Sequence, residues 1–148
     1  MDRGTAVALT AVVGGLVALQ APINSGLGKT VGTFQGAFAS FLIGTTLLCV
    51  IAAFSKGGLA QVAEIRNVPS WHYLLGGLLG AAYVTTVLVT VRTLGAGALT
   101  AATISGQLTM SAAVDQFGWL GVDRNPITLP RVIGLLLLVA GTFLVVRP

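Results

Sequence analysis

The sequence has few charged residues. Only 8% of its 148 residues are Asp, Glu, Lys or Arg, whereas soluble domains carry about 25%. So few charges cannot keep the surface of a globule of this size wet, and 55% hydrophobic residues argue against a disordered chain. The eight basic residues are scattered singly and do not form the cluster that nucleic-acid binding requires. The composition therefore indicates a membrane protein without a nucleic-acid partner.

Cysteine and histidine each occur once, as Cys49 and His72. A single cysteine makes no internal disulfide, and in its apolar surroundings it acts as a small hydrophobe. His72 has no second His, Cys or acid nearby in sequence, so we interpret it as an interfacial residue and not as a metal ligand. We expect no metal site and no cofactor. An enzyme is the least favoured class, because catalysis needs a nucleophile with its base, a carboxylate pair or a metal set.

Long apolar runs are what the sequence has instead. A helix that spans a bilayer needs about 20 mostly apolar residues, and no run alternates apolar and polar residues as a half-buried strand does. The sequence therefore predicts an all-α membrane protein, with residues 1–148 forming a single transmembrane domain. Its five predicted spans are Gly4–Asn24, Thr33–Phe54, Trp71–Val91, Ala96–Trp119 and Arg131–Val146.

The segments between these runs read as connections. Residues 25–32 carry three glycines and one lysine, and residues 92–95 read as a tight turn. The longest linker, 55–70, contains a candidate short surface helix at 59–66. The first run is too long for a secretory signal, so we expect it to be retained.

The basic residues leave the orientation open. An odd number of spans puts the termini on opposite sides, with five Lys or Arg on the N-terminal side and three on the other. This weak bias favours a cytoplasmic N-terminus without fixing it. Insertion in both orientations (dual topology) would allow an antiparallel dimer, formed either by two copies of the chain or by the chain and a homologue. The five basic residues on the N-terminal side are Arg3, Lys56, Arg66, Arg124 and Arg131, and the three on the opposite side are Lys29, Arg92 and Arg147.

The fourth run carries a polar stripe at every fourth residue, which places its members on one helix face. The stripe consists of Thr103, Gln107, Ser111 and Asp115. Ionisable residues within a membrane are costly and usually functional. Asp115 is the only one inside a run, although it lies near the end, where it could also simply reach headgroup water. Gln107 lies near the middle.

The first run ends in a second polar pair, Gln20 and Asn24, one turn apart with Pro22 between them. Proline cannot donate a hydrogen bond to the carbonyl of Ala18. Interrupted membrane helices mark transporter binding sites, and prolines also kink helices for packing alone. In an antiparallel dimer, Gln20 and Asn24 of one copy would lie at about the depth of Asp115 in the other. We therefore predict a shared substrate site that consists of Gln20, Asn24, Gln107, Ser111 and Asp115.

Glycines predict how the helices pack. Gly76 and Gly80 form a small-xxx-small pair, and Gly134 and Gly141 lie two turns apart on the last run. Such spacing permits close approach of helix backbones. We predict that Gly134 and Gly141 pack in the dimer interface. No strand or phosphate-loop pattern accompanies the glycines, so nucleotide binding is not indicated.

Two segments carry the most specific resemblance to the YdcZ-type family of inner-membrane exporters in the drug/metabolite transporter superfamily. They are Gln20-Ala21-Pro22-Ile23-Asn24, and Ser105-Gly106-Gln107-Leu108 with Ser111, Asp115, Phe117 and Gly118. The last helix, Gly134-Leu135-Leu136-Leu137-Leu138-Val139-Ala140-Gly141, is similar to the glycine-based pairing helix of small multidrug transporters. The resemblance covers nearly the whole chain. It implies a half-sized, bacterial inner-membrane subunit that pairs into a ten-helix bundle and transports small organic solutes by alternating access.

One departure limits what carries over from this resemblance. Small multidrug transporters keep a membrane-embedded glutamate in the first helix, and this chain has no acid there, so proton or cation exchange is not implied. Asp115 in the fourth run is a candidate substitute only. The expected function is a small-solute transporter subunit. The alternatives are a passive channel for a small neutral solute and a structural or accessory membrane protein. The expected partners are membrane lipid, the second half-transporter and the solute.

Overall fold

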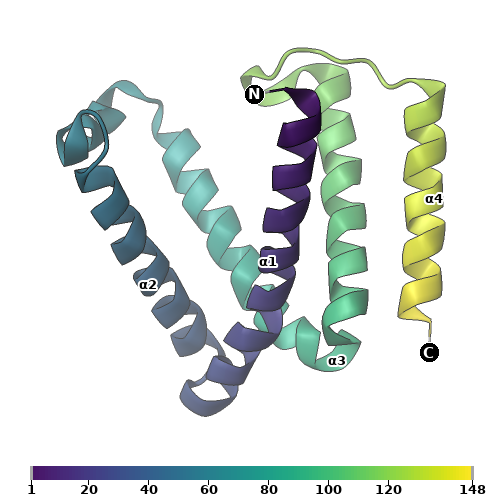
Figure 1. Cartoon of the computed structure of the whole chain (residues 1–148), viewed down its shortest axis with the longest axis horizontal. Coiled ribbons are helices and arrows are strands. Elements are labelled where there is room, and N and C mark those ends of the chain that lie inside the picture. Colours follow the sequence, from purple (N-terminus) through teal and green to yellow (C-terminus); the bar gives the residue numbers. More distant parts are fainter. Residues whose placement is uncertain (1, 148) are drawn as a thin grey trace. The chain divides into compact units, whose positions relative to one another are not determined.

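The computed structural model describes residues 2–147, all of whose regular elements are helical. The chain divides between residues 92 and 93 into two compact units. Figure 1 labels the α-helices α1 to α4. The elements in chain order are α1 (Arg3–Val31), α2 (Thr33–Ala53), the 3₁₀ helix η1 (Gly58–Asn67), α3 (Ser70–Phe117), the 3₁₀ turn η2 (Trp119–Gly121) and α4 (Leu129–Val146). The predicted all-α class is confirmed, whereas the ten-helix bundle stays a prediction.

Helix α1 is longer than the sequence pattern indicated. Asp2 caps its N-terminus by accepting hydrogen bonds from the backbone N–H and the hydroxyl of Thr5, at 2.9 and 2.6 Å. These bonds, the side-chain one first, hold the pKa of Asp2 below its usual value. The helix passes through Pro22 and ends at Val31, before Gly32 with φ 100°. The predicted connection at 25–32 is therefore wrong for all but its last residue.

Packing explains why the glycine-rich segment stays helical. Ser25 and Gly28 are buried, and a Cβ added at Gly28 would lie 3.2 Å from a methyl of Leu88. Leu88, on α3, is completely buried. Tertiary packing of this kind outweighs the low helix propensity of glycine.

Helix α3 is long enough for two membrane crossings. Its 48 residues correspond to roughly 72 Å at 1.5 Å per residue, against about 30 Å of hydrocarbon. Gly95, with φ 77° and ψ 165°, interrupts the helical backbone in a conformation that glycine adopts without strain. Where a turn over residues 92–95 was predicted, only Gly95 leaves the helix. The segments 70–94 and 96–117 correspond to the third and fourth predicted runs.

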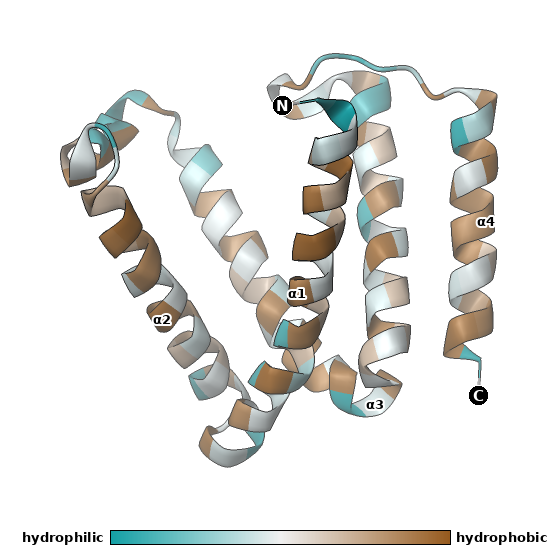
Figure 2. Ribbon diagram, viewed as in Figure 1, coloured by the Kyte–Doolittle hydropathy of each residue, from teal (hydrophilic) through white to brown (hydrophobic). Residues whose placement is uncertain are grey.

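The described helices suit a lipid environment. Four of them, α1 to α4, are long and apolar enough to cross a membrane, and α4 has no buried residue. Figure 2 shows hydrophobic residues along α1, α2 and α4, and hydrophilic ones mainly at their ends. The predicted short helix at 59–66 is present as η1, although it is a 3₁₀ helix. These helices therefore expose apolar side chains, which are unfavourable in water and can contact lipid or other helices.

In the second unit, a pair of hydroxyl groups joins α3 to α4. Ser105 Oγ and Thr142 Oγ1 lie 2.5 Å apart, and the Thr142 hydroxyl also donates to the carbonyl of Ala101 at 3.2 Å. Polar groups that bond across helices hold membrane bundles together, because lipid offers no alternative partner.

Replacing Thr142 by valine keeps the shape of the side chain and removes these bonds. We expect the free energy of unfolding to fall by about 1 kcal/mol, which is within the range measured for interhelical hydrogen bonds in membranes. Thermal unfolding in detergent micelles measures the change. Thr109→Val is the matched control, because the Thr109 hydroxyl bonds within its own helix, to the carbonyl of Ser105. Equal losses in the two variants would contradict this role of Thr142.

Candidate solute-binding site

The polar stripe of α3, apart from Thr103, lies at an open hollow in the second unit. Gln107, Ser111 and Asp115 line a volume of about 580 Å³ together with apolar residues and a glycine. One face of a single helix brings the three polar side chains together, as the four-residue spacing predicts. The apolar part of the lining consists of Met110, Val114 and Val122, and the glycine is Gly106.

Asp115 has a charged partner that the sequence analysis missed. Arg131, at the start of α4, donates a hydrogen bond from its guanidinium to the Asp115 carboxylate at 3.1 Å. The two side chains are partly exposed, at 29% for Asp115 and 41% for Arg131. A signal did exist in the sequence, because both residues fall on the membrane side that was assigned to the N-terminus. The pair leaves the polar hollow without net charge.

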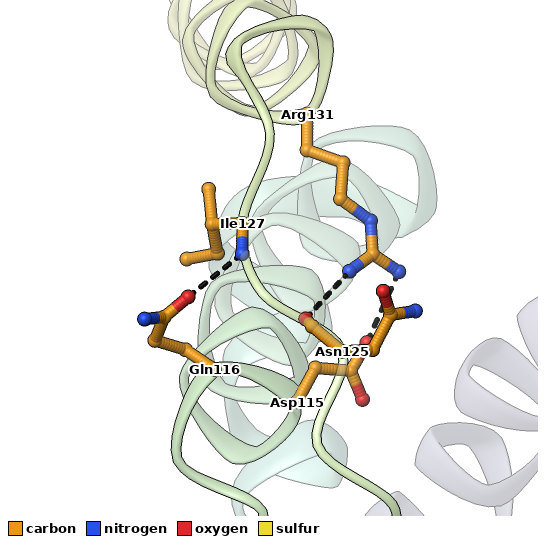
Figure 3. Close-up of polar contacts among 5 residues, drawn as sticks. All are labelled: Asp115, Gln116, Asn125, Ile127 and Arg131. Atoms are coloured by element: carbon orange, nitrogen blue, oxygen red, sulfur yellow. Dashed lines mark hydrogen bonds and ion pairs between the residues drawn. The ribbon is translucent and has the colours of Figure 1, made fainter.

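The connection that follows α3 is held against the end of that helix, as Figure 3 shows. The backbone N–H of Asn125 donates to the carbonyl of Asp115 at 2.8 Å. The N–H of Ile127 donates to the side-chain oxygen of Gln116 at 2.7 Å, and Arg131 also donates to the carbonyl of Asn125 at 3.2 Å. The carboxylate of Asp115 is therefore held by Arg131 of α4, and the backbone of Asp115 by the connection.

Gln20 lies at a different hollow, inside the first unit. This second hollow has a volume of about 220 Å³. Its lining comes from three helical segments: Gln20 of α1, Val84 of α3, and Ser40, Phe41, Gly44, Thr45 and Leu48 of α2. Sequence analysis singled out Gln20 alone. It gave no signal for Ser40 and Thr45, because single hydroxyl residues in apolar runs are usually bonded to their own helix.

Asn24 and Ser25 are buried, at 7% and 5% exposure. The Ser25 hydroxyl donates to the carbonyl of Leu88 at 3.3 Å, and Arg92 Nε donates to the same hydroxyl at 3.1 Å. These bonds fix α1 to residues 88–92 of α3. This arrangement was not predictable from the sequence, because Ser25 and Arg92 fall in segments whose pattern indicates connections and not helices.

The glycines differ in their surroundings. A Cβ added at Gly134 or Gly141 would meet no atom within 4 Å, and the same holds for Gly76. A Cβ at Gly80 would lie 3.7 Å from the ring of Phe41, so Gly80 permits an approach of α2 to α3. The two α4 glycines pack against nothing in their own unit, and their role in a dimer stays a prediction.

Residues 2–147 contain no candidate metal site. No three residues of the His, Cys, Asp and Glu types come close enough there to hold a metal ion. The ring of His72 stacks on Trp71 with centroids 3.7 Å apart, and its Nδ1 lies 3.2 Å from the carbonyl of Pro69. Its position at the membrane interface stays a prediction.

Long apolar helices, scarce charge and a polar hollow on a membrane helix define an integral membrane protein with features of a solute transporter. A family model described as "Putative inner membrane exporter, YdcZ" matches residues 5–144. The chain belongs to this family, and it is an inner-membrane protein. The family is one of exporters and not of enzymes. No curated protein matches the chain, and no solved structure matches it.

Proposed function

We propose that this chain is one half of a small-solute exporter that works by alternating access as an antiparallel dimer. The observation that carries the proposal is the hollow lined by Gln107, Ser111 and Asp115. Polar side chains on a membrane helix are expensive unless they face a partner or a solute. These side chains line one hollow, and the chain belongs to a family of exporters. Both facts favour a solute, and not another part of the protein, as their partner.

The uncovered surface of α4 supports the pairing of two half-transporters. Helix α4 has no buried residue, and a Cβ at Gly134 or Gly141 would meet no atom within 4 Å. Small residues on an open face allow a second helix to approach closely. The weak charge bias allows the second copy to insert in the opposite orientation, and a homologous half-transporter would serve equally well.

In this proposal the solute contacts residues of both copies. Gln20 and Asn24 come from one copy and the partner's Asp115 from the other, at a similar depth in the membrane, and Gln107 is presented by both. Alternating access then exposes this site to one side of the membrane at a time. The Asp115–Arg131 pair leaves the site without net charge, which suits a small uncharged solute.

A stabilisation screen followed by transport tests the proposed function. A solute that binds only the folded protein raises its melting temperature, so purified protein is screened against small cations, amino acids, sugars and amides. The solutes that stabilise it are then followed in proteoliposomes. Saturable movement driven by a gradient is the expected result. Non-saturable movement would indicate a passive channel, and no movement would indicate an accessory protein.

A further inference from the structure

The hollow at Gln20 contains polar side chains from two membrane helices. Ser40 and Thr45 lie well inside α2 (Thr33–Ala53), and Gln20 faces the same hollow from α1. These positions lie at the depth of the hydrocarbon when the two helices span the bilayer. A side-chain amide and two hydroxyls therefore share a space of about 220 Å³.

These three side chains lack the intrahelical hydrogen bond that several threonines on the membrane helices make. The hydroxyl of Thr46, beside Thr45 in sequence, donates to the carbonyl of Leu42 in its own helix at 2.8 Å. Thr10 and Thr90 bond to their own helices in the same way. No side-chain hydrogen bond among the described residues uses the amide of Gln20 or the hydroxyls of Ser40 and Thr45. Polar groups in an apolar environment are costly without a partner, so these three remain free for a ligand.

The chemistry of the lining restricts the ligand. No ionisable side chain lines this hollow, whose other members are apolar or glycine. A charged ligand would lose its hydration without gaining a counter-charge. Phe41 offers an aromatic ring for an apolar body to pack against. A cavity of about 150 Å³ holds benzene, so about 220 Å³ suits one ring with a polar substituent.

We propose that this hollow binds a small uncharged solute that presents an amide or hydroxyl group to Gln20, Ser40 and Thr45 and a flat apolar body to Phe41. The inference rests on the proposed function, because it assigns a substrate class to the part of the site that contains Gln20. Ser40 and Thr45 become binding residues that the sequence pattern did not identify.

Three molecules of one shape and different charge test this inference. Benzamide is neutral, the benzamidinium ion is positive and benzoate is negative. We measure their binding to the purified full-length protein in detergent by titration calorimetry and by the shift in melting temperature. Benzamide is expected to bind and to stabilise the protein, and the two charged molecules are expected to bind at least about tenfold more weakly, because the hollow offers no counter-charge.

Matched variants locate the site. Ser40→Ala and Thr45→Val each remove one hydroxyl and are expected to weaken benzamide binding roughly three- to tenfold, the effect of one lost hydrogen bond. Thr46→Val is the control and leaves binding unchanged, because its hydroxyl is bonded within its own helix. Gly44→Leu adds a bulky side chain at the lining of the hollow and removes no polar group, and a Cβ at Gly44 meets nothing within 4 Å. This variant is expected to abolish binding.

Several results would overturn the inference. They are no benzamide binding to the wild-type protein, equal affinity for the three molecules, or unchanged binding in the Thr45→Val and Gly44→Leu variants. Binding in detergent needs no gradient. If benzamide does not bind, the inference fails, and the export proposal is still tested separately by the transport assay. If the protein binds benzamide as expected but moves no solute in proteoliposomes, the binding site is supported and the export proposal is refuted.

Discussion

Replacing Asp115 by asparagine is expected to lower solute transport at least about tenfold while the protein keeps its fold. In the proposed site the Asp115 carboxylate accepts a hydrogen bond from the solute, and a charge-assisted hydrogen bond of this kind is typically worth about 1.5–3 kcal/mol, or tenfold and more in binding. The substitution also leaves the guanidinium of Arg131 without its carboxylate, 3.1 Å away in the wild type, at the edge of the proposed solute site. Initial rates in proteoliposomes measure the loss.

Stability separates this functional role from a structural one. Both side chains of the pair are about a third exposed, and exposed ion pairs contribute only about 0–1 kcal/mol to folding. The melting temperature should therefore change little in Asp115→Asn. Asp123→Asn is the matched control, because it removes an exposed acid from the connection that follows α3. If the two variants transported solute equally well, Asp115 would have no place in the site.

Replacing Gly36 by leucine is expected to cost about 3 kcal/mol of folding free energy, and replacing it by alanine about 1 kcal/mol. An ideal Cβ at Gly36 would lie 2.9 Å from the Cα of Gly28 and 3.1 Å from its nitrogen. Because these are backbone atoms of α1, no side-chain rotation relieves the clash. Overpacking of this kind typically costs about 1–3 kcal/mol. Thermal unfolding in detergent measures the graded loss.

Gly15 provides the control for Gly36. It also lies in a membrane helix of the first unit, but a Cβ there would meet no atom within 4 Å. Gly15→Ala should leave stability unchanged or raise it by up to about 1 kcal/mol, since alanine favours helices over glycine. If Gly36→Ala and Gly15→Ala behaved alike, the close approach of α1 and α2 would not be what holds them together.

The helical class could be predicted from the sequence because long apolar runs with scarce charge have few other solutions. Helix ends were harder to predict. The glycines at 26 and 28 read as a connection, yet packing against Leu88 keeps α1 helical to Val31. A local pattern reports intrinsic preference, whereas contacts between distant segments decide which glycine ends a helix. At Gly32, φ is 100°, and the helix stops there.

The candidate site was predictable where its residues share one helix. The spacing of Gln107, Ser111 and Asp115 sets one face, and the structure places all three at one hollow. Contacts between helices were not predictable in this way. Neither the pairing of Asp115 with Arg131 nor the meeting of Gln20 with Ser40 and Thr45 follows from spacing, because each depends on how separate helices pack.

The central claim, that two copies work together in opposite orientations, is tested most directly by the sidedness of the chain in the membrane. Cys49 is the only cysteine, so a Cys49→Ser background allows single-cysteine probes. Ala60→Cys in η1 and Thr30→Cys near the end of α1 place exposed probes on the two predicted membrane sides. Neither substitution alters the Lys and Arg residues that govern orientation.

Labelling with a membrane-impermeant maleimide, in intact cells that express this chain alone, reads out the orientation. We predict that about half of the molecules carrying each probe are labelled from outside, as expected for a chain that inserts both ways with little charge bias. Complete labelling of one probe and none of the other would show a single fixed orientation. With no partner protein present, that result would contradict an antiparallel pair of two copies of this chain.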